Sequence, residues 1–175
     1  KYQLYDPICC AGPNCSTLHY VKNDDEIGQD KKSVLIDAGA EWKCYASDVT
    51  RCFPINGDWI KEHLQIYSIV LKMQQVTMEM IKPGALWDEE AIFESDITTR
   101  FFPHGLGHLL GLDTHDVGGR PNYDDTNQKL RYLRLRRELR KGMVITNEPG
   151  VYFSPFLLHD VLNDAKKMEF INETV

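Results

Sequence analysis

The chain has 175 residues, of which 42% are hydrophobic, and its 20 Lys and Arg against 26 Asp and Glu give a net charge of −6. This length is typical of one domain with a core of its own, and the acidic balance argues against nucleic acid as a partner, because phosphate-backbone binding needs clustered cations. No apolar run approaches the roughly 18 residues of a membrane-spanning helix, so we expect no membrane partner either.

The N-terminal third of the sequence predicts antiparallel strands. Short runs that are apolar, rich in β-branched residues or alternating between polar and apolar occupy residues 8–11, 17–21, 33–37 and 43–53. Turn residues such as Gly12 and Pro13 separate them. We therefore expect a small sheet built from hairpins.

Residues 58–82 change to helical periodicity. Apolar side chains recur there with the spacing of one helix face, at Ile60, Leu64, Tyr67, Leu71, Met78 and Ile81. Residues 82–84, Lys-Pro-Gly, are a stop signal. This segment predicts the one long amphipathic helix of the chain, and such a helix ordinarily turns its apolar stripe toward the core.

The C-terminal half is less regular. Residues 88–100 are acidic and weakly helical, and residues 101–120 contain too many glycines for a helix. The basic stretch 131–141 predicts an exposed strand or loop, and residues 143–146 predict a short strand. The tail after Phe153 shows little periodicity. Several strands with one strong helix indicate an α+β fold with an antiparallel sheet.

Five cysteines, an odd number with no C-x-x-C pair, disfavour both a disulfide framework and a structural zinc site. We expect buried free thiols in a reducing, cytoplasmic setting, with a Cys44–Cys52 bridge as the alternative. The chain opens at Lys1 without a signal segment or an initiator Met. We therefore expect a fragment, a processed chain or an incomplete reading frame.

Two aspartates flank the turn of the predicted hairpin. With a four-residue loop at 41–44, Asp37 and Asp48 would stand directly opposite each other, with Cβ atoms about 5 Å apart. Two like charges there repel, and a shared proton or a divalent cation would relieve the repulsion. A different register, with both side chains solvated, is the alternative. A metal-free aspartate pair of an acid hydrolase also fits, but it leaves His108 and Glu148 unexplained.

Histidines and one glutamate supply further candidate ligands. His104, His108 and His115 fall close together among glycines that let a substrate approach the backbone, and histidine is both a metal ligand and a proton carrier. Glu148 stands between a short apolar run and Pro149. Each of these alone also fits a packing or solvated role. Together with the aspartates they form an oxygen-rich set that favours a hard divalent ion such as manganese.

Six motifs in one order resemble a known family. They are Thr-Leu-His-Tyr at 17–20, Asp-Ala-Gly-Ala at 37–40, Ser-Asp-Val-Thr-Arg at 47–51, His-Gly-Leu-Gly-His at 104–108, His-Asp-Val-Gly-Gly at 115–119 and Glu-Pro-Gly at 148–150. The chain resembles prolidase and the Xaa-Pro aminopeptidases, metallopeptidases of the pita-bread fold, and is most similar to their fungal branch. The resemblance implies that residues 1–175 form a partial pita-bread domain, an antiparallel sheet with helices on one face.

The resemblance also implies a two-metal centre. Asp37 would bind one manganese ion, Asp48 would bridge two, and His108 and Glu148 would bind the second. A hydroxide between the ions would attack the carbonyl before proline. The expected activity is that of a manganese-dependent Xaa-Pro dipeptidase or aminopeptidase, acting on dipeptides or on peptide N-termini.

Further roles follow from the same resemblance. Glu148 would relay a proton, and His115 would stabilise the oxyanion or protonate the leaving nitrogen. His19 and His104 would line the substrate pocket. Arg134 would bind the substrate carboxylate, and a solvated basic face is its alternative reading.

Departures from the family pattern carry their own expectations. The N-terminal domain, one internal helix after residues 86–87 and the C-terminal strand with the last bridging glutamate have no counterpart. Without that shared carboxylate, the second ion should bind weakly. The alternative function is therefore a catalytically inactive remnant that binds peptides or partners, and a homodimer stays open.

Overall fold

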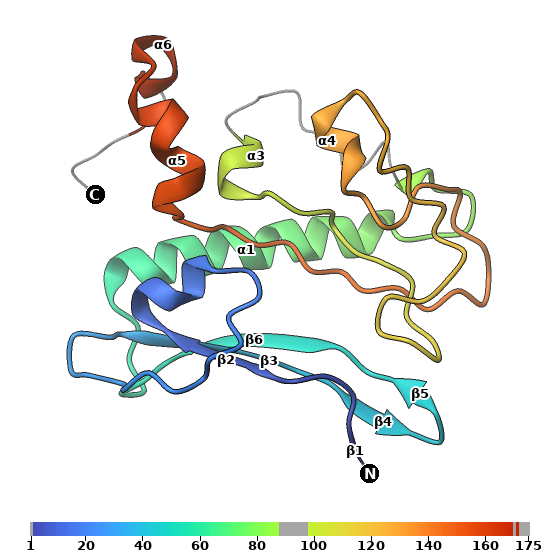
Figure 1. Ribbon diagram of the computed structural model, residues 1–175, viewed down its shortest axis with the longest axis horizontal. Coiled ribbons are helices and arrows are strands. Elements are labelled where there is room, and N and C mark those ends of the chain that lie inside the picture. Colours follow the sequence, from blue (N-terminus) through green and yellow to red (C-terminus); the bar gives the residue numbers. More distant parts are fainter. Residues whose placement is uncertain (1, 88–97, 170, 172–175) are drawn as a thin grey trace.

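The computed structural model of the chain describes residues 2–87, 98–169 and 171. Strands lie on one side and helices on the other (Figure 1). One antiparallel sheet has the order β1-β4-β5, from Tyr2–Gln3, Ala40–Trp42 and Tyr45–Ala46, and the other has the order β2-β3-β6, from Ile8–Ala11, Ser33–Ala38 and Val49–Pro54. The helices are η1 (Gly12–Ser16, 3-10), α1 (Lys61–Met80), α3 (Thr98–Phe101), α4 (Gln128–Arg131), α5 (Pro155–Leu162) and α6 (Ala165–Met168). The α+β prediction, with helices on one face of the sheets, is confirmed.

The hairpin forms, but with a shorter turn than predicted. Lys43 and Cys44 both have positive φ, 51° and 68°, as the two central residues of a type I′ turn do. This two-residue turn pairs Asp37 with Thr50, not with Asp48. The predicted direct opposition of the two aspartates is therefore wrong by two residues, and Asp48 lies in the break between β5 and β6.

The strand predicted over residues 17–21 is absent. Gly12 has a φ of 58° and Pro13 occupies the first turn of η1, and proline's fixed φ favours a helix start. The chain then makes a turn through Tyr20 and continues without regular structure to Lys32. Every cysteine is a free thiol and only Cys10 is buried, which corrects the expectation of buried thiols throughout.

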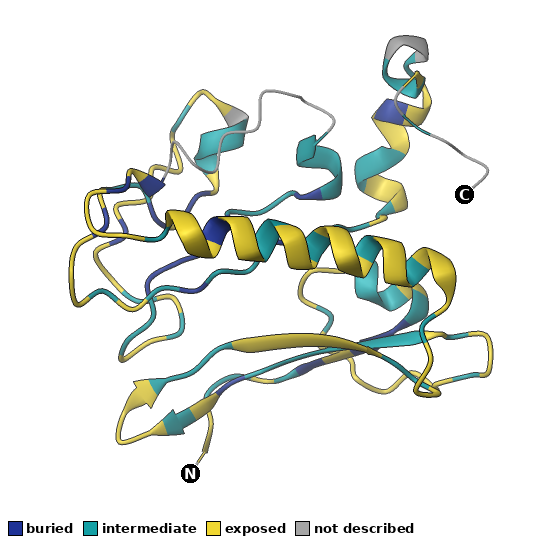
Figure 2. Cartoon of the chain, turned by 180° about the vertical axis from the view of Figure 1, so that it is seen from behind, coloured by how far each residue is buried: buried dark blue, intermediate teal, exposed yellow. Residues whose placement is uncertain are grey.

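Helix α1 is confirmed within the predicted range, but it presents a different face to the core. Met73 and Ile81 pack against the main hydrophobic cluster, and Thr77 is the buried residue of the helix. The predicted apolar stripe is largely exposed: Leu64 is 46%, Leu71 42% and Met78 58% accessible. Figure 2 shows most of the outer surface of α1 as exposed.

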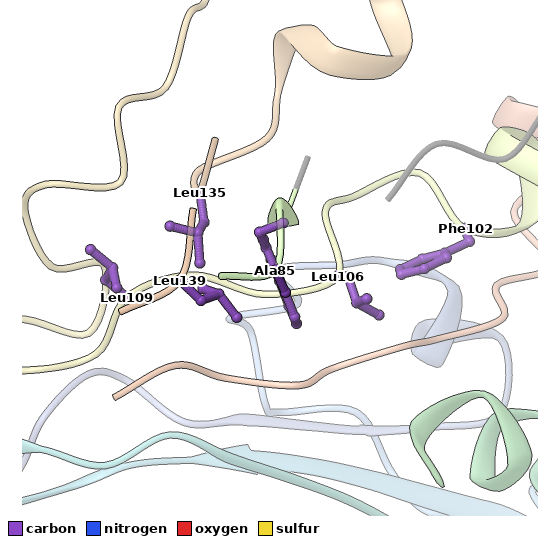
Figure 3. Packing of buried hydrophobic residues seen from close by; sticks show 7 residues of the cluster. Ala85, Phe102, Leu106, Leu109, Leu135 and Leu139 are labelled. Atoms are coloured by element: carbon purple, nitrogen blue, oxygen red, sulfur yellow. The ribbon is translucent and has the colours of Figure 1, made fainter. Parts of the chain in front are cut away.

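The core lies between the C-terminal segments and α1. Its buried cluster comprises Ala85, Trp87, Phe102, Leu106, Leu109, Leu135 and Leu139 (Figure 3). The last two come from the stretch predicted to be an exposed basic strand or loop. It is irregular, as expected, but it buries alternate leucines and leaves Arg134 and Glu138 exposed.

Two extended segments of the glycine-rich region pair with each other. The backbone N–H of Leu110 donates to Val144 (3.0 Å), that of Thr146 to His108 (3.0 Å) and that of Glu148 to Leu106 (2.9 Å). The prediction of no helix over residues 101–120 holds from residue 102 onward, because Phe101 is the last residue of α3. The strand predicted over 143–146 is reduced to one bridge, Leu109 with Ile145.

The structure differs from the prediction in the C-terminal tail. The tail, predicted without periodicity, forms α5 and α6. Of the weakly helical segment 88–100, residues 88–97 lie outside the described residues, and Thr98 begins α3. Within the described parts of the chain, no helix is long and apolar enough to cross a membrane.

Candidate functional site

Asp37 and Asp48 meet at one hydroxyl group. The Tyr5 hydroxyl donates toward Asp37 Oδ1 at 2.5 Å and lies 3.1 Å from Asp48 Oδ1. Gly39 leaves room for the ring, because a Cβ there would lie 2.5 Å from Tyr5 Cε1. Burial and the two carboxylates raise the pKa of Tyr5 far above its ordinary value. Tyr5 is a site residue that the sequence analysis missed, since no motif surrounds it.

His108 presents one defined nitrogen to the site. Its side chain is 5% exposed, and Nδ1 lies 2.9 Å from the Leu109 carbonyl oxygen. A carbonyl only accepts, so Nδ1 carries the proton and Nε2 faces outward. Nε2 lies 3.3 Å from Asp48 Oδ2 and 3.2 Å from Glu148 Oε1. Burial alone would lower the pKa of His108, but the hydrogen bond to Asp48 and the neighbouring charges outweigh it and raise the pKa.

Thr146 connects His108 to Glu148. Its hydroxyl accepts from the His108 backbone N–H at 2.9 Å and donates to Glu148 Oε1 at 2.7 Å. Burial raises the pKa of Glu148 in spite of that hydrogen bond, and burial likewise raises the pKa of Asp37. The hydrogen bond to His108 lowers the pKa of Asp48. Thr146 lies on one of the two paired segments and therefore holds the Glu148 carboxylate next to His108.

The donor set has the chemistry of a divalent metal site. Carboxylate oxygens and an imidazole nitrogen suit a hard to borderline cation, and a cation would keep the partly buried Asp37 and Glu148 ionised. In the arrangement described here the side chains contact each other directly. Among the described residues, no three His, Cys, Asp or Glu side chains stand in a geometry that would already hold an ion.

His115 and Arg134 lie beside this cluster. The His115 ring is 4.5 Å from the His108 ring, at an interplanar angle of 81°. Burial and the positive charge of Arg134 lower the pKa of His115 to about 4. Arg134 is exposed and close to His115, so its guanidinium is available to an anionic group in the site.

His104 is held as a neutral ring. Its Nδ1 lies 2.8 Å from the Gly105 carbonyl oxygen, and its Nε2 lies 2.8 Å from the Tyr152 hydroxyl. The Nδ1–H therefore donates to the Gly105 carbonyl, and the Tyr152 hydroxyl donates to Nε2. Burial lowers the pKa of His104. Tyr152 is a second residue near the site that the sequence analysis did not single out.

His19 sits on the turn after η1. It lines an open hollow of about 420 Å³ together with Asn14, Thr17 and Tyr20. Within the described part of the chain, no other predicted site residue lines this hollow. Side-chain contacts, direct or through Tyr5, form one cluster of the predicted site residues Asp37, Asp48, His108, Glu148 and His115. The roles assigned to the predicted site residues stay predictions.

Two aspartates that follow Glu148 in the chain form ion pairs with nearby cations. Asp160 pairs with Arg100 at 3.8 Å, and Asp164 pairs with Lys167 at 3.7 Å. Residue 173 lies outside the described residues. The last bridging carboxylate expected from the resemblance therefore has no counterpart among these two aspartates.

Comparisons with known proteins place the chain among metallopeptidases. The sequence pattern of metallopeptidase family M24 matches residues 1–175. An uncharacterized peptidase of Saccharomyces cerevisiae is 50% identical over 197 residues, covering 98% of this chain and 37% of that protein. A protein of Sordaria macrospora named "Probable Xaa-Pro aminopeptidase" is 45% identical over 198 residues, covering all of this chain and 42% of the relative.

Solved structures agree with the sequence comparisons. An alanine variant of Escherichia coli aminopeptidase P superposes with a TM-score of 0.71 at 36% identity, covering 88% of this chain and 38% of that one. Proline aminopeptidase P II from Yersinia pestis gives a TM-score of 0.71 at 34% identity, with the same two coverages. The chain therefore spans about two fifths of the length of the relatives that it matches.

Proposed function

The chain belongs to metallopeptidase family M24 and carries part of the pita-bread fold of its Xaa-Pro aminopeptidases, and from this premise we propose that it takes part in metal-dependent cleavage before proline. The observation that carries the proposal is the approach of His108 Nε2 to Asp48 Oδ2 and Glu148 Oε1, at 3.3 and 3.2 Å. In this arrangement a proton on Nε2 bonds to the carboxylates, and a divalent cation would take the place of that proton.

We favour aminopeptidase over dipeptidase action. The sequence analysis left prolidase-type cleavage of Xaa-Pro dipeptides beside cleavage at peptide N-termini. Relatives from several fungi are named as Xaa-Pro aminopeptidases, which supports a peptide with proline in second position as the substrate.

Asp37, Asp48, His108 and Glu148 would hold the metal, and the hard donor set favours manganese. When bound, the metal supplies Lewis acidity and lowers the pKa of a water molecule. Glu148, whose carboxylate accepts from the Thr146 hydroxyl, would take a proton from that water.

The remaining residues would act on the substrate. His115 would donate its ring N–H to the developing oxyanion. Arg134 would bind the substrate's carboxylate as a fork. His19 and His104 would line the substrate pocket.

Proline-peptide hydrolysis with manganese tests this proposal. We expect the chain to release the N-terminal residue of an Xaa-Pro-Xaa tripeptide, and Asp48→Asn to lose at least about 100-fold in rate, the scale of losing an essential catalytic group. Asp113→Asn, at an exposed aspartate, is the matched control and should act like the wild type. An Asp48→Asn protein as active as the wild type would refute the proposal.

The alternative is a peptide-binding protein without activity, favoured by the absent bridging carboxylate. In that case the wild-type chain would bind the tripeptide in the presence of manganese, and Arg134→Ala would weaken binding, yet no N-terminal residue would be released.

A further inference from the structure

Cys10 and Cys52 lie on one face of the β2-β3-β6 sheet, next to Cys15 of η1, and Asp37 lies on the same face, two residues along β3 from Leu35. Cys10 on β2 is paired with Leu35 on β3, and Leu35 is paired with Cys52 on β6. The side chains of Cys10, Leu35 and Cys52 therefore share one face of the sheet. Cys9 alternates to the other face and is exposed.

Helix η1 brings a third thiol, that of Cys15, close to Cys10. It lies against β2 and β3, and the Cys15 thiol is in hydrogen-bonding contact with the Cys10 thiol. Cys10 is 3% exposed, and its Sγ lies 3.8 Å from the Leu35 carbonyl oxygen. Cys15 is partly exposed. A buried thiol therefore lies beside one that small molecules can reach.

The two thiols differ in acidity. The hydrogen bond from Cys10 lowers the pKa of Cys15 to about 7 against the opposing effect of burial, and the charge of Lys31 acts in the same direction. The same pairing raises the pKa of Cys10 far above its usual value, and burial raises that of Cys52 to about 11. Near neutral pH, Cys15 thus supplies a thiolate, the nucleophilic form of cysteine.

We propose that Cys15 and Cys10 are a peroxide-oxidisable pair that closes to a reversible disulfide. The Cys15 thiolate attacks one oxygen of hydrogen peroxide and breaks the O–O bond, which leaves a sulfenic acid and hydroxide. The Cys10 sulfur then attacks the Cys15 sulfur, and the sulfenic oxygen leaves as water with the Cys10 proton. The two thiols lose two electrons, and the peroxide is reduced to two waters. This goes beyond the proposed function and needs no metal.

The bond would tie η1 to β2 directly ahead of the turn that carries His19. We expect Cys15 to pair with Cys10 because their thiols are in contact. Cys44 lies elsewhere, at the hairpin turn between β4 and β5. Reduction by a dithiol would restore both thiols.

Peptide mapping of the purified chain after treatment with hydrogen peroxide tests the pair. No Lys or Arg lies between Lys1 and Lys22, so trypsin leaves Cys9, Cys10 and Cys15 in one peptide. We expect that peptide to become lighter by two hydrogens and to be alkylated at Cys9 only. Dithiothreitol should restore alkylation at all three positions.

Variants identify the partners. Cys9→Ser and Cys44→Ser should keep the mass loss, and Cys15→Ser should abolish it. Before oxidation, alkylation of Cys15 should reach half its maximal rate near pH 7. A wild-type peptide that keeps three alkylated cysteines after peroxide would overturn the proposal. A mass loss that persists in Cys15→Ser, or a bond from Cys15 to Cys52, would do so too.

Discussion

At the residue scale, backbone carbonyls decide which nitrogen each site histidine offers. The Nδ1–H of His108 donates a hydrogen bond to the Leu109 carbonyl, and the Nδ1–H of His104 donates one to the Gly105 carbonyl. In both rings Nε2 therefore faces the neighbouring side chains. For His108 those are two carboxylates, and for His104 the Tyr152 hydroxyl. Two chemically identical rings therefore differ in what they can bind.

The pH dependence of stability tests the state of His104. Burial lowers its pKa in the folded protein below the value of about 6.5 in an unfolded chain. Between these values the unfolded state binds more protons, so stability is lost as the pH falls through about 6.5. We expect the melting temperature of His104→Gln to fall less than that of the wild type between about pH 8 and pH 5.5.

His159→Gln is the control, because the side chain of His159 is 75% exposed. It should melt with the pH dependence of the wild type. If His104→Gln shows that dependence too, His104 is not the group whose protonation destabilises the fold.

At the element scale, the pairing of residues 106–110 with 144–148 depends on a glycine. A Cβ on Gly107 would lie 2.1 Å from the Thr146 carbonyl oxygen, whereas one on Gly105 would lie 3.1 Å from the flexible end of Leu133. We expect Gly107→Ala to cost about 1–3 kcal/mol of unfolding free energy, the usual range for overpacking. Gly105→Ala should cost clearly less.

Urea unfolding of both variants measures this difference. Equal unfolding free energies for Gly107→Ala and the wild type would show that the two segments are not packed as closely as described. Because Thr146 orients Glu148, the same displacement should also weaken metal binding by Gly107→Ala.

How far the sequence predicts each element depends on the range of the interactions that set it. The apolar period of residues 60–81 predicts α1, and β-branched residues predict β3. The hairpin register depends on positive φ at Lys43 and Cys44, which have neither the freedom of glycine nor the local hydrogen bonds of asparagine. No local pattern predicts it.

The candidate site shows the same division. The family resemblance singles out Asp37, Asp48, His108 and Glu148, because each lies in one of the six ordered motifs. The Tyr5 contacts bridge 32 and 43 positions of sequence. Such a contact exists only once the sheet has formed, so the sequence gives no signal for it.

At the scale of the whole molecule, the chain exposes more surface than its mass requires. Its accessible area is 12071 Å² for 20.2 kDa, while a compact protein of that mass exposes about 8,800 Å². The apolar stripe of α1 contributes to the excess. Relatives match over 198 residues against the 175 of this chain, so they carry additional residues inside the matched region.

The exposed stripe should bind an apolar dye. We expect the folded chain to enhance the fluorescence of anilinonaphthalene sulfonate, because contiguous exposed apolar surface binds such probes. A Leu64→Gln, Leu71→Gln double variant should reduce the enhancement without lowering stability, as both side chains are exposed. A folded chain that binds no dye would show that the stripe is covered in solution.

A calorimetric titration with manganese tests the central claim most directly, that Asp48, His108 and Glu148 form a metal site. We expect at least one ion to bind per wild-type chain. Glu148→Gln, which keeps an oxygen for the Thr146 hydroxyl, should bind at least about tenfold more weakly, as loss of a ligand charge demands. Equal manganese affinity in the wild type and Glu148→Gln, or no binding heat in the wild type, would contradict the account.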